Sequence, residues 1–169
     1  QAGTAEKAAK IAEFVPIINA GDGNGEHPTQ ALLDLYTIYE KFGRLDNITS
    51  VMAGDPLNSR TIHSLIRGLS LYKNNTIYLL SPKQLRLSRE YFSKFSKQGV
   101  RLIEIESVNE MPKNAHVWYW TRVQKERFTD LEAYEKVKDS FYLTTDLVKK
   151  FGNKDLILMD PLPRVGKLD

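Results

Sequence analysis

Residues 48–80 read ITSVMAGDPLNSRTIHSLIRGLSLYKNNTIYLL, and this stretch decides the fold. Its two ends, residues 48–53 and 76–80, are short apolar runs typical of buried strands. Between them, residues 60–72 carry apolar side chains at helical spacing on one face, namely Ile62, Leu65, Ile66 and Leu69. A strand, a helix and a second strand in this order predict a βαβ unit whose strands are parallel.

The same alternation continues to the end of the chain. Further strand-like runs lie at residues 101–105, 116–120 and 155–159. Helical stretches are predicted at residues 84–97, 131–137 and 144–151. Because crossovers between parallel strands are right-handed, the pattern predicts an α/β, doubly wound (Rossmann-like) fold. We expect a five-stranded parallel sheet in the order 3-2-1-4-5, with helices on both faces.

Upstream of the sheet, the sequence predicts two helices joined by a loop. Residues 1–13 are typical of a short amphipathic helix, and the glycine-rich residues 21–25 of a loop. Pro28 suits a first helical position and Gly43 a C-terminal stop. Between them, apolar residues recur at helical spacing: Leu32, Leu35, Tyr36, Tyr39 and Phe42.

Composition limits the class of protein. The 169 residues, 41% hydrophobic and 27% charged, suit one globular domain. The absence of cysteine excludes disulfides, thiolate metal sites and a cysteine nucleophile. A net charge of +3 is too small to indicate a nucleic-acid partner, and no apolar run reaches the about 18 residues of a membrane span. A cytoplasmic location is the default expectation. Because the chain opens at Gln1 rather than Met, we expect it to be part of a longer protein.

Ligands of open α/β sheets bind beyond the carboxyl ends of the strands, where the strand order reverses. In this sequence those ends are residues 54–60, 121–124 and 160–164. The first and fourth strands should be neighbours, so Arg60 and Arg122 could converge there. Two guanidinium groups suit a ligand with two carboxylates, or with a carboxylate and a phosphate. The alternative that each arginine is a solvated surface side chain stays open.

His27 and Gln30 stand three residues apart at a predicted helix start, so their side chains share one face. The N–H groups and the dipole at such a start favour partial negative charge. The pair could donate hydrogen bonds to a carbonyl oxygen or orient an amide, or His27 could simply cap the helix. His63 and His116 fall inside a predicted helix and strand, where packing or surface roles are expected.

Several familiar kinds of site are missing from the sequence. Residues 21–25 lack the spacing of a dinucleotide fingerprint, and no phosphate-binding loop ends in Gly-Lys-Ser/Thr. No cluster has the spacing of metal ligands, so no metal site is predicted. Residues 68–70 lie in a predicted helix and form no nucleophile elbow, and residues 118–120 indicate a buried strand. The prediction is an arginine-rich site that orients small anions.

Several segments of the chain carry a resemblance to a known family. They are VPIINAGDG at 15–23, HPTQALLDLYTI at 27–38, GD at 54–55, SRTIHSL at 59–65, TRVQKER at 121–127 and PLPRV at 161–165. Together they closely resemble aspartate carbamoyltransferase (aspartate transcarbamylase) over nearly the whole chain. Ornithine carbamoyltransferase shares the His-Pro-x-Gln element, but residues 122–127 and 161–164 resemble the aspartate enzyme.

The resemblance implies a cytoplasmic transferase of pyrimidine biosynthesis that converts L-aspartate and carbamoyl phosphate to N-carbamoyl-L-aspartate and phosphate. It implies that the reaction needs no cofactor and that the enzyme is a homotrimer whose site borrows residues from a neighbouring subunit. Whether regulatory subunits are also partners stays open. Residues 1–27 would be the end of the carbamoyl-phosphate domain and the start of the interdomain helix. Residues 28–169 would be the aspartate-binding domain without the family's C-terminal helix, and this chain alone is expected to show no turnover.

The resemblance also assigns residues to carbamoyl phosphate. His27 would hydrogen-bond the carbamoyl carbonyl oxygen, and Gln30 would hold the carbamoyl amide. The turn formed by Pro161, Leu162 and Pro163 would bind the same substrate, through the backbone carbonyls of its first two residues. A cis peptide bond is expected between Leu162 and Pro163.

On the aspartate side, the resemblance implies that Arg60 and Arg122 bind the two carboxylates. Gln124 would assist Arg122, Glu126 would orient it, and Arg127 would bridge to the other domain. For Glu126 and Arg127, an ordinary exposed charge pair is the alternative.

The sequence departs from the family in two places. Asp160 stands where the family usually has histidine, and residues 57–59 are Leu-Asn-Ser where it often has Lys-Tyr-Gly. These departures leave open a non-catalytic relative that acts in assembly or ligand sensing. A dinucleotide-binding oxidoreductase domain would share the fold but lacks its glycine fingerprint here.

Overall fold

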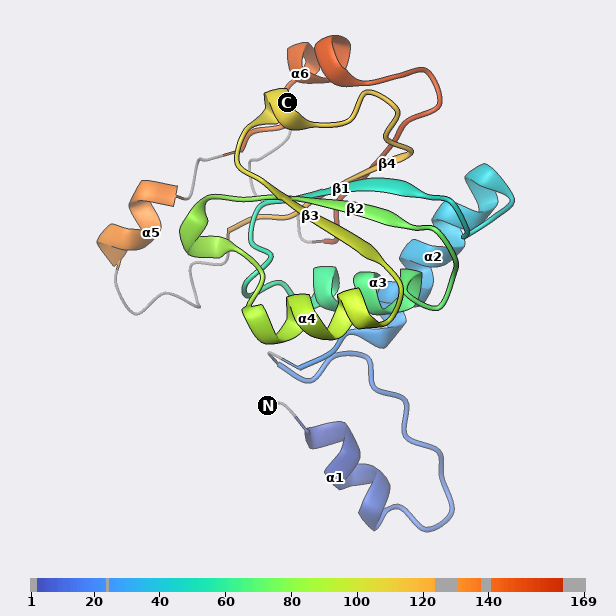
Figure 1. Cartoon of the computed structure of the whole chain (residues 1–169). Helices are drawn as coiled ribbons and strands as arrows, with labels where there is room; N and C mark the ends of the chain where they lie inside the picture. Colours follow the sequence, from blue (N-terminus) through green and yellow to red (C-terminus); the bar gives the residue numbers. More distant parts are fainter. Residues whose placement is uncertain (1–2, 24, 124–130, 138–140, 163–169) are drawn as a thin grey trace.

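The computed structural model describes residues 3–23, 25–123, 131–137 and 141–162. Its five parallel strands are β1 (Thr49–Ala53), β2 (Thr76–Leu80), β3 (Arg101–Ile105), β4 (Val117–Trp120) and β5 (Ile157–Met159). They lie in the order β3-β2-β1-β4-β5, which confirms the predicted topology (Figure 1). The strand order reverses at β1 and β4, where Ser50 pairs with Val117 and Ala53 with Trp120.

Helices cover both faces of the sheet, as predicted. On one face lie α2 (Pro28–Phe42), α3 (Arg60–Leu69) and α4 (Arg89–Lys97). On the other lie α6 (Thr145–Phe151) and the 3-10 turn η2 (Val108–Glu110) (Figure 1). α5 (Leu131–Val137) follows β4, and α1 (Thr4–Ile11) lies beyond the α2–α4 layer without a buried residue. Within the described residues, no helix has the length and hydropathy that crossing a membrane requires.

Side chains alternate along the strands and build two separate cores. On β1, Met52 packs with the α2–α4 layer, whereas Val51 packs on the α6 side. β4 repeats this pattern with Tyr119 on the first side and Trp118 and Trp120 on the second, all three no more than 2% exposed. A parallel sheet covered on both faces needs apolar side chains on both, and these strands supply them.

Polar caps fix where the helices begin. Ser59, Ser88 and Thr144 each accept a backbone N–H of the first helical turn that follows. Because Ser88 takes the cap position, α4 begins only at Arg89, and residues Lys83–Leu85 form the separate 3-10 turn η1. The predicted helix over 84–97 is therefore wrong for its first part. The predicted helix over 60–72 runs too far, since α3 ends at Leu69.

α2 is confirmed as a helix, but its buried face differs from the one that the apolar periodicity outlines. The residues buried against the sheet are Ala31, Asp34, Leu35 and Ile38. The opposite side carries a set of apolar residues that are 53–67% exposed, here called the exposed α2 face: Leu32, Leu33, Tyr36 and Tyr39. A polar residue thus lies in the core stripe, and aromatic rings lie outside it.

Candidate active site

The carboxyl ends of β1 and β4 approach so closely that no side chain fits between them. Thr121, directly after β4, donates both its N–H and its hydroxyl to the carbonyl oxygen of Ala53, each at 2.9 Å. Gly54, directly after β1, has a φ of +116°, and a Cβ there would lie 2.1 Å from the Thr121 carbonyl oxygen. Only glycine suits this position. The loops that leave the two strands therefore start side by side.

The loop after β1 is built around a buried carboxylate. Asp55 is fully buried, and its Oδ1 accepts the backbone N–H of Asn58 at 3.1 Å and the Asn58 side-chain amide at 3.0 Å. His63 is 4% exposed and donates from Nε2 to the carbonyl oxygen of Pro56 at 2.7 Å, which confirms its packing role. These contacts set the path of the loop that leads into Arg60, the first residue of α3.

Arg60 reaches back toward the glycine-rich loop before α2. The guanidinium Nη1 donates to the carbonyl oxygen of Gly23 at 2.8 Å. A Cβ at Gly21, whose φ is +123°, would lie 3.2 Å from the same nitrogen. The arginine is half-buried and held in place, so it is not an ordinary solvated side chain.

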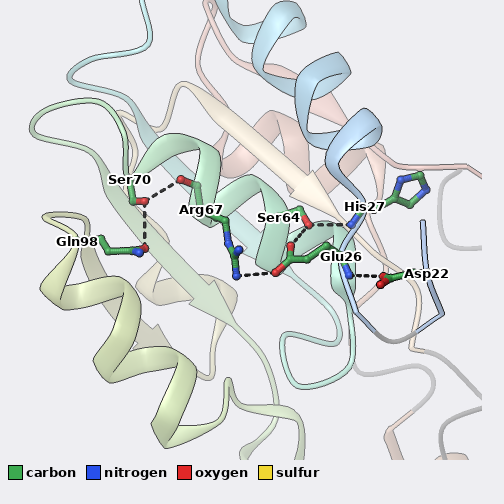
Figure 2. Close-up of polar contacts among 7 residues, drawn as sticks. All are labelled: Asp22, Glu26, His27, Ser64, Arg67, Ser70 and Gln98. Atoms are coloured by element: carbon green, nitrogen blue, oxygen red, sulfur yellow. Dashed lines mark hydrogen bonds and ion pairs between the residues drawn. The ribbon is translucent and has the colours of Figure 1, made fainter. Parts of the chain in front are cut away.

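His27 stands at the N-cap of α2, but its side chain makes no capping hydrogen bond. Its backbone N–H donates to Ser64 Oγ of α3 at 3.0 Å. Ser64 donates in turn to the carboxylate of Glu26, which lies 2.6 Å from Arg67 Nη2 (Figure 2). Glu26, Ser64 and Arg67 form what is here called the Ser64 clamp. It ties the start of α2 to the middle of α3.

Two effects favour the neutral form of the His27 ring. Burial lowers the pKa of His27 below its ordinary value, and the positive charge of Arg60 lowers it further. The two side chains start from adjoining segments, because Arg60 contacts the loop at Gly21 and Gly23, just before His27 in the chain. A neutral imidazole retains one N–H, which can be donated to a carbonyl oxygen.

Gln30, in the first turn of α2, leads into a buried polar network. Its Nε2 donates to Asp34 Oδ1 at 2.9 Å, and the other carboxylate oxygen accepts the Tyr119 hydroxyl at 2.9 Å. Asp34 is 3% exposed and Tyr119 is fully buried. Burial raises the pKa of Asp34 to about 6, against the opposing effect of its two hydrogen bonds. Burial and the Asp34 charge raise the pKa of Tyr119 well above its ordinary value.

Comparison with known protein families gives two matches along the chain. Residues 46–168 match the aspartate/ornithine carbamoyltransferase Asp/Orn binding domain, and residues 1–40 match the carbamoyl-P binding domain of the same family. The chain belongs to the aspartate/ornithine carbamoyltransferase family.

Several curated relatives that match this chain are named aspartate carbamoyltransferase catalytic subunits. The subunit of Methanocaldococcus jannaschii is 46% identical over 167 residues, covering 97% of this chain and 54% of the relative. That of Methanobrevibacter smithii is 43% identical over 154 residues, covering 91% and 48%. The chain spans about half the length of the curated relatives that it matches.

Solved structures of carbamoyltransferases share the fold. The catalytic subunit of M. jannaschii aspartate transcarbamoylase matches with a TM-score of 0.88 at 44% identity, over 100% of this chain and 54% of the other. Aspartate transcarbamoylase from Trypanosoma cruzi, in complex with N-(phosphonacetyl)-L-aspartic acid (PALA), matches with a TM-score of 0.80 at 32% identity, over 99% and 52%. The predicted carbamoyltransferase-like α/β fold is confirmed.

The structure places four of the residues predicted for the carbamoyltransferase site near the switch point. His27 and Gln30 open α2, and Arg60 opens α3 close to His27. Arg122 is half-buried two residues after β4, at the same edge of the sheet as Arg60. That the two arginines bind one ligand stays a prediction.

The remaining predicted residues follow β5 or lie outside the described residues. Pro161 is half-buried and Leu162 is 80% exposed, directly beyond Asp160. Four predicted residues lie outside the described ranges, and with them the peptide bond between Leu162 and Pro163: Gln124, Glu126, Arg127 and Pro163.

The other histidine and the question of metals can be treated together. His116 precedes β4, and its Nδ1 accepts the backbone N–H of Thr49 at 3.0 Å, which is a structural role. In the ranges that the structure covers, no three His, Cys, Asp or Glu side chains are grouped so as to hold a metal ion.

Sequence reasoning missed the residues behind the site. Ser64 and Asp34 contact predicted site residues, and Glu26 and Tyr119 contact these two in turn, yet none of the four was singled out. One signal was available for Asp34, because it stands four residues after Gln30, a spacing at which glutamine and aspartate pair on a helix. Nothing local pointed to Ser64, which is 37 residues away from His27 in the chain.

Proposed function

We propose that this chain forms the aspartate-binding half of the active site of an aspartate carbamoyltransferase. The observation that carries the proposal is the Ser64 clamp, which joins the helix start bearing a neutral His27 to the helix that begins with Arg60. A hydrogen-bond donor beside a fixed cation suits a reaction in which a carbonyl oxygen gains negative charge near a carboxylate substrate. The T. cruzi enzyme, solved with carbamoyl phosphate, with aspartate and phosphate, and with PALA, supports this assignment.

In the proposed reaction the amine of L-aspartate attacks the carbonyl carbon of carbamoyl phosphate. The new C–N bond replaces the C–O bond to phosphate, phosphate leaves, and the amine loses a proton. His27 would donate to the carbonyl oxygen and Gln30 would bind the carbamoyl amide. The backbone carbonyls of Pro161 and Leu162, in the turn completed by Pro163, would accept from the reacting nitrogens. Catalysis of this kind depends on orientation and preorganised polarity, without a covalent enzyme intermediate or a cofactor.

The aspartate side of the proposed site depends on two arginines. Arg60 and Arg122 would each pair with one substrate carboxylate, and Gln124 would assist Arg122. Glu126 would orient the same guanidinium, and Arg127 would contact the other domain. Bidentate pairing of this type fixes both the position and the direction of a dicarboxylate.

The exposed α2 face suits contact with the rest of a carbamoyl-phosphate domain. Its apolar side chains lie within the segment, residues 1–40, that matches this domain in the family. A domain boundary at residues 27 and 28 stays a prediction from the resemblance, whereas the family matches assign residues 1–40 to the carbamoyl-P binding domain and residues 46–168 to the Asp/Orn binding domain. A homotrimer, regulatory subunits, a place in pyrimidine biosynthesis and a cytoplasmic location remain predictions from the resemblance.

A hybrid subunit tests the proposed function. Residues 1–169 would replace the matching half of the M. jannaschii catalytic subunit, so that the other half supplies the rest of the carbamoyl-phosphate domain. We expect the hybrid to form N-carbamoyl-L-aspartate, measured with labelled aspartate, and to bind PALA in calorimetry. His27→Ala and Arg60→Ala should each lower kcat/KM by about 100-fold. Lys97→Ala, at the exposed end of α4, is the matched control and should leave kcat/KM unchanged.

Each alternative has its own outcome. The 169-residue chain alone should show no turnover. A hybrid that folds and assembles but neither turns over nor binds PALA would overturn the proposal and favour a non-catalytic relative acting in assembly or ligand sensing. Carbamoylation of ornithine in place of aspartate would overturn the choice of substrate.

A further inference from the structure

Asp34 is a carboxylate in the core, and no cation pairs with it in the part of the chain that the structure describes. It lies in the buried stripe of α2, and its partners among the described residues are two neutral donors, the Gln30 amide and the Tyr119 hydroxyl. Burying a charge between neutral donors costs stability relative to an apolar residue of similar size. A residue that costs stability at such a position calls for a role other than packing.

The chemistry of the contact fixes the orientation of Gln30. An ionised carboxylate can only accept hydrogen bonds, so the Gln30 NH₂ group must face Asp34, as the 2.9 Å contact has it. The Oε1 atom of the same amide then points away from Asp34, and it is an acceptor. Without the carboxylate, the amide could turn about its last torsion and present the NH₂ group instead.

Tyr119 holds the carboxylate from the opposite side. It lies on β4, three residues before Arg122, and its hydroxyl occupies the second oxygen of Asp34. Thr61, the residue after Arg60, and Asp160, the residue before Pro161, both act on the pKa of Tyr119. The hydroxyl thus connects β4 with α2 through Asp34, and groups from the start of α3 and the end of β5 also act on it.

We propose that Asp34, held by Tyr119, is a positioning residue that turns the Gln30 amide so that its Oε1 accepts from the NH₂ group of the carbamoyl substrate. This inference rests on the proposed function. Neither Asp34 nor Tyr119 touches the substrate in this proposal. Both act through Gln30.

The test compares Asp34→Asn, Gln30→Ala and the double variant in the hybrid subunit. An asparagine at position 34 can donate to Gln30 Oε1 or accept from its NH₂ group, so the preferred orientation of the Gln30 amide is lost. We expect KM for carbamoyl phosphate to rise about tenfold in Asp34→Asn, with a smaller change in kcat. Because Asp34 acts through Gln30, adding Asp34→Asn to Gln30→Ala should cause no further loss. Ser50→Ala, a core hydroxyl on β1 without a hydrogen-bond partner among the described residues, is the matched control.

A pH profile supplies a readout that a merely structural role would not move. The charged or titratable groups acting around this network are Asp34 itself, Tyr119 and, through Tyr119, Asp160. Protonated Asp34 can donate to Gln30 Oε1 and so favours the wrong orientation of the amide. Affinity for carbamoyl phosphate should therefore fall as the pH drops through about 6 in the wild-type hybrid. The Asp34→Asn hybrid should lack this component, whereas the titration of His27 is common to both.

The outcomes separate the two proposals. A wild-type hybrid without turnover or PALA binding overturns the proposed function, and this inference with it. An active hybrid in which Asp34→Asn leaves KM unchanged, or lowers kcat/KM equally with and without Gln30, overturns the inference alone. If Asp34→Asn fails to fold, Tyr119→Phe tests the inference in its place. An unchanged KM for carbamoyl phosphate in that variant would equally overturn the inference.

Discussion

At Gly54 the backbone has a φ of +116°, and any Cβ would meet the carbonyl oxygen of Thr121 at 2.1 Å. The contact joins the ends of β1 and β4, so it cannot be relieved by a flexible side chain moving aside. The positive φ and the lack of space each exclude any residue other than glycine at position 54, where the loop of the proposed site leaves β1.

Gly54→Ala should be among the most damaging single substitutions in this chain. We expect it to lower the free energy of unfolding by about 3 kcal/mol or more, because backbone must move to admit the methyl group. Gly43→Ala is the matched control: Gly43 also has a positive φ, +66°, but nothing lies within 4 Å of its Cβ position. It should cost about 1 kcal/mol. Urea denaturation followed by circular dichroism measures both, and equal costs would contradict the steric argument.

Asp34 makes a second prediction at the residue scale, on stability rather than activity. Its pKa of about 6 in the folded chain lies above the ordinary value of 3.8. The folded chain therefore binds the proton more readily, so ionised Asp34 destabilises the fold at neutral pH and this penalty fades as the pH falls through about 6. The free energy of unfolding of Asp34→Asn, relative to that of wild type, should be about 2 kcal/mol higher at about pH 8 than at about pH 4.5. Urea denaturation at both pH values checks this, and a pH-independent difference would refute it.

Among the elements, α2 and α3 matter most, because their first residues carry the proposed site. The Ser64 clamp joins them through a backbone N–H, so it positions the start of α2 and not only one side chain. Its ion pair between Glu26 and Arg67 is partly exposed and contributes little by itself. The hydroxyl of Ser64 makes the contact that positions His27, so it matters more to the site than the ion pair does.

Ser64→Ala should lower kcat/KM of the hybrid subunit about tenfold, since His27 loses the contact that fixes its backbone. The loss in stability should stay near about 1 kcal/mol, as for an ordinary hydrogen bond. Ser70→Ala is the control at the C-cap of the same helix, where the hydroxyl donates to the Arg67 carbonyl at 2.7 Å, away from His27 (Figure 2). Equal effects of the two substitutions on kcat/KM would contradict the role given to Ser64.

Predictability from the sequence differed between elements and contacts. The strands and the buried face of α3 could be predicted because each depends on apolar residues at a short, regular period. The buried face of α2 could not, because the periodicity weighs apolar residues while Asp34 takes one of the inward positions. Contacts such as Ser64 with His27 depend on how two distant segments are placed, which no local pattern encodes.

At the scale of the whole molecule, most large apolar side chains that are more than half exposed, among the described residues, belong to residues 11–39. Besides the exposed α2 face, the segment before α2 also exposes apolar side chains, since Phe14, Val15 and Ile18 are 64–93% exposed. Groups of exposed apolar side chains mark interaction sites in folded proteins. Other exposed apolar side chains lie apart from these segments in the sequence, such as Leu71 at 79% exposure.

The 169-residue chain should therefore self-associate in solution. Replacing Leu32 and Tyr36 by lysine should shift it toward the monomer in sedimentation velocity, with little change in the free energy of unfolding, because both side chains are more than 60% exposed. Leu71→Lys, an exposed leucine outside the exposed α2 face, should leave the sedimentation profile as it was. A wild-type chain that stays monomeric at all concentrations would refute the prediction.

The alternation of side chains along β4 has a consequence for spectroscopy. The chain has two tryptophans, Trp118 and Trp120, and both pack on the α6 side of the sheet. Intrinsic tryptophan fluorescence therefore reports on that core alone, while the helices that carry the proposed site lie on the opposite face. A fluorescence trace could stay native while α2 and α3 loosen, so coincident fluorescence and far-ultraviolet dichroism transitions would establish that both halves melt as one cooperative unit.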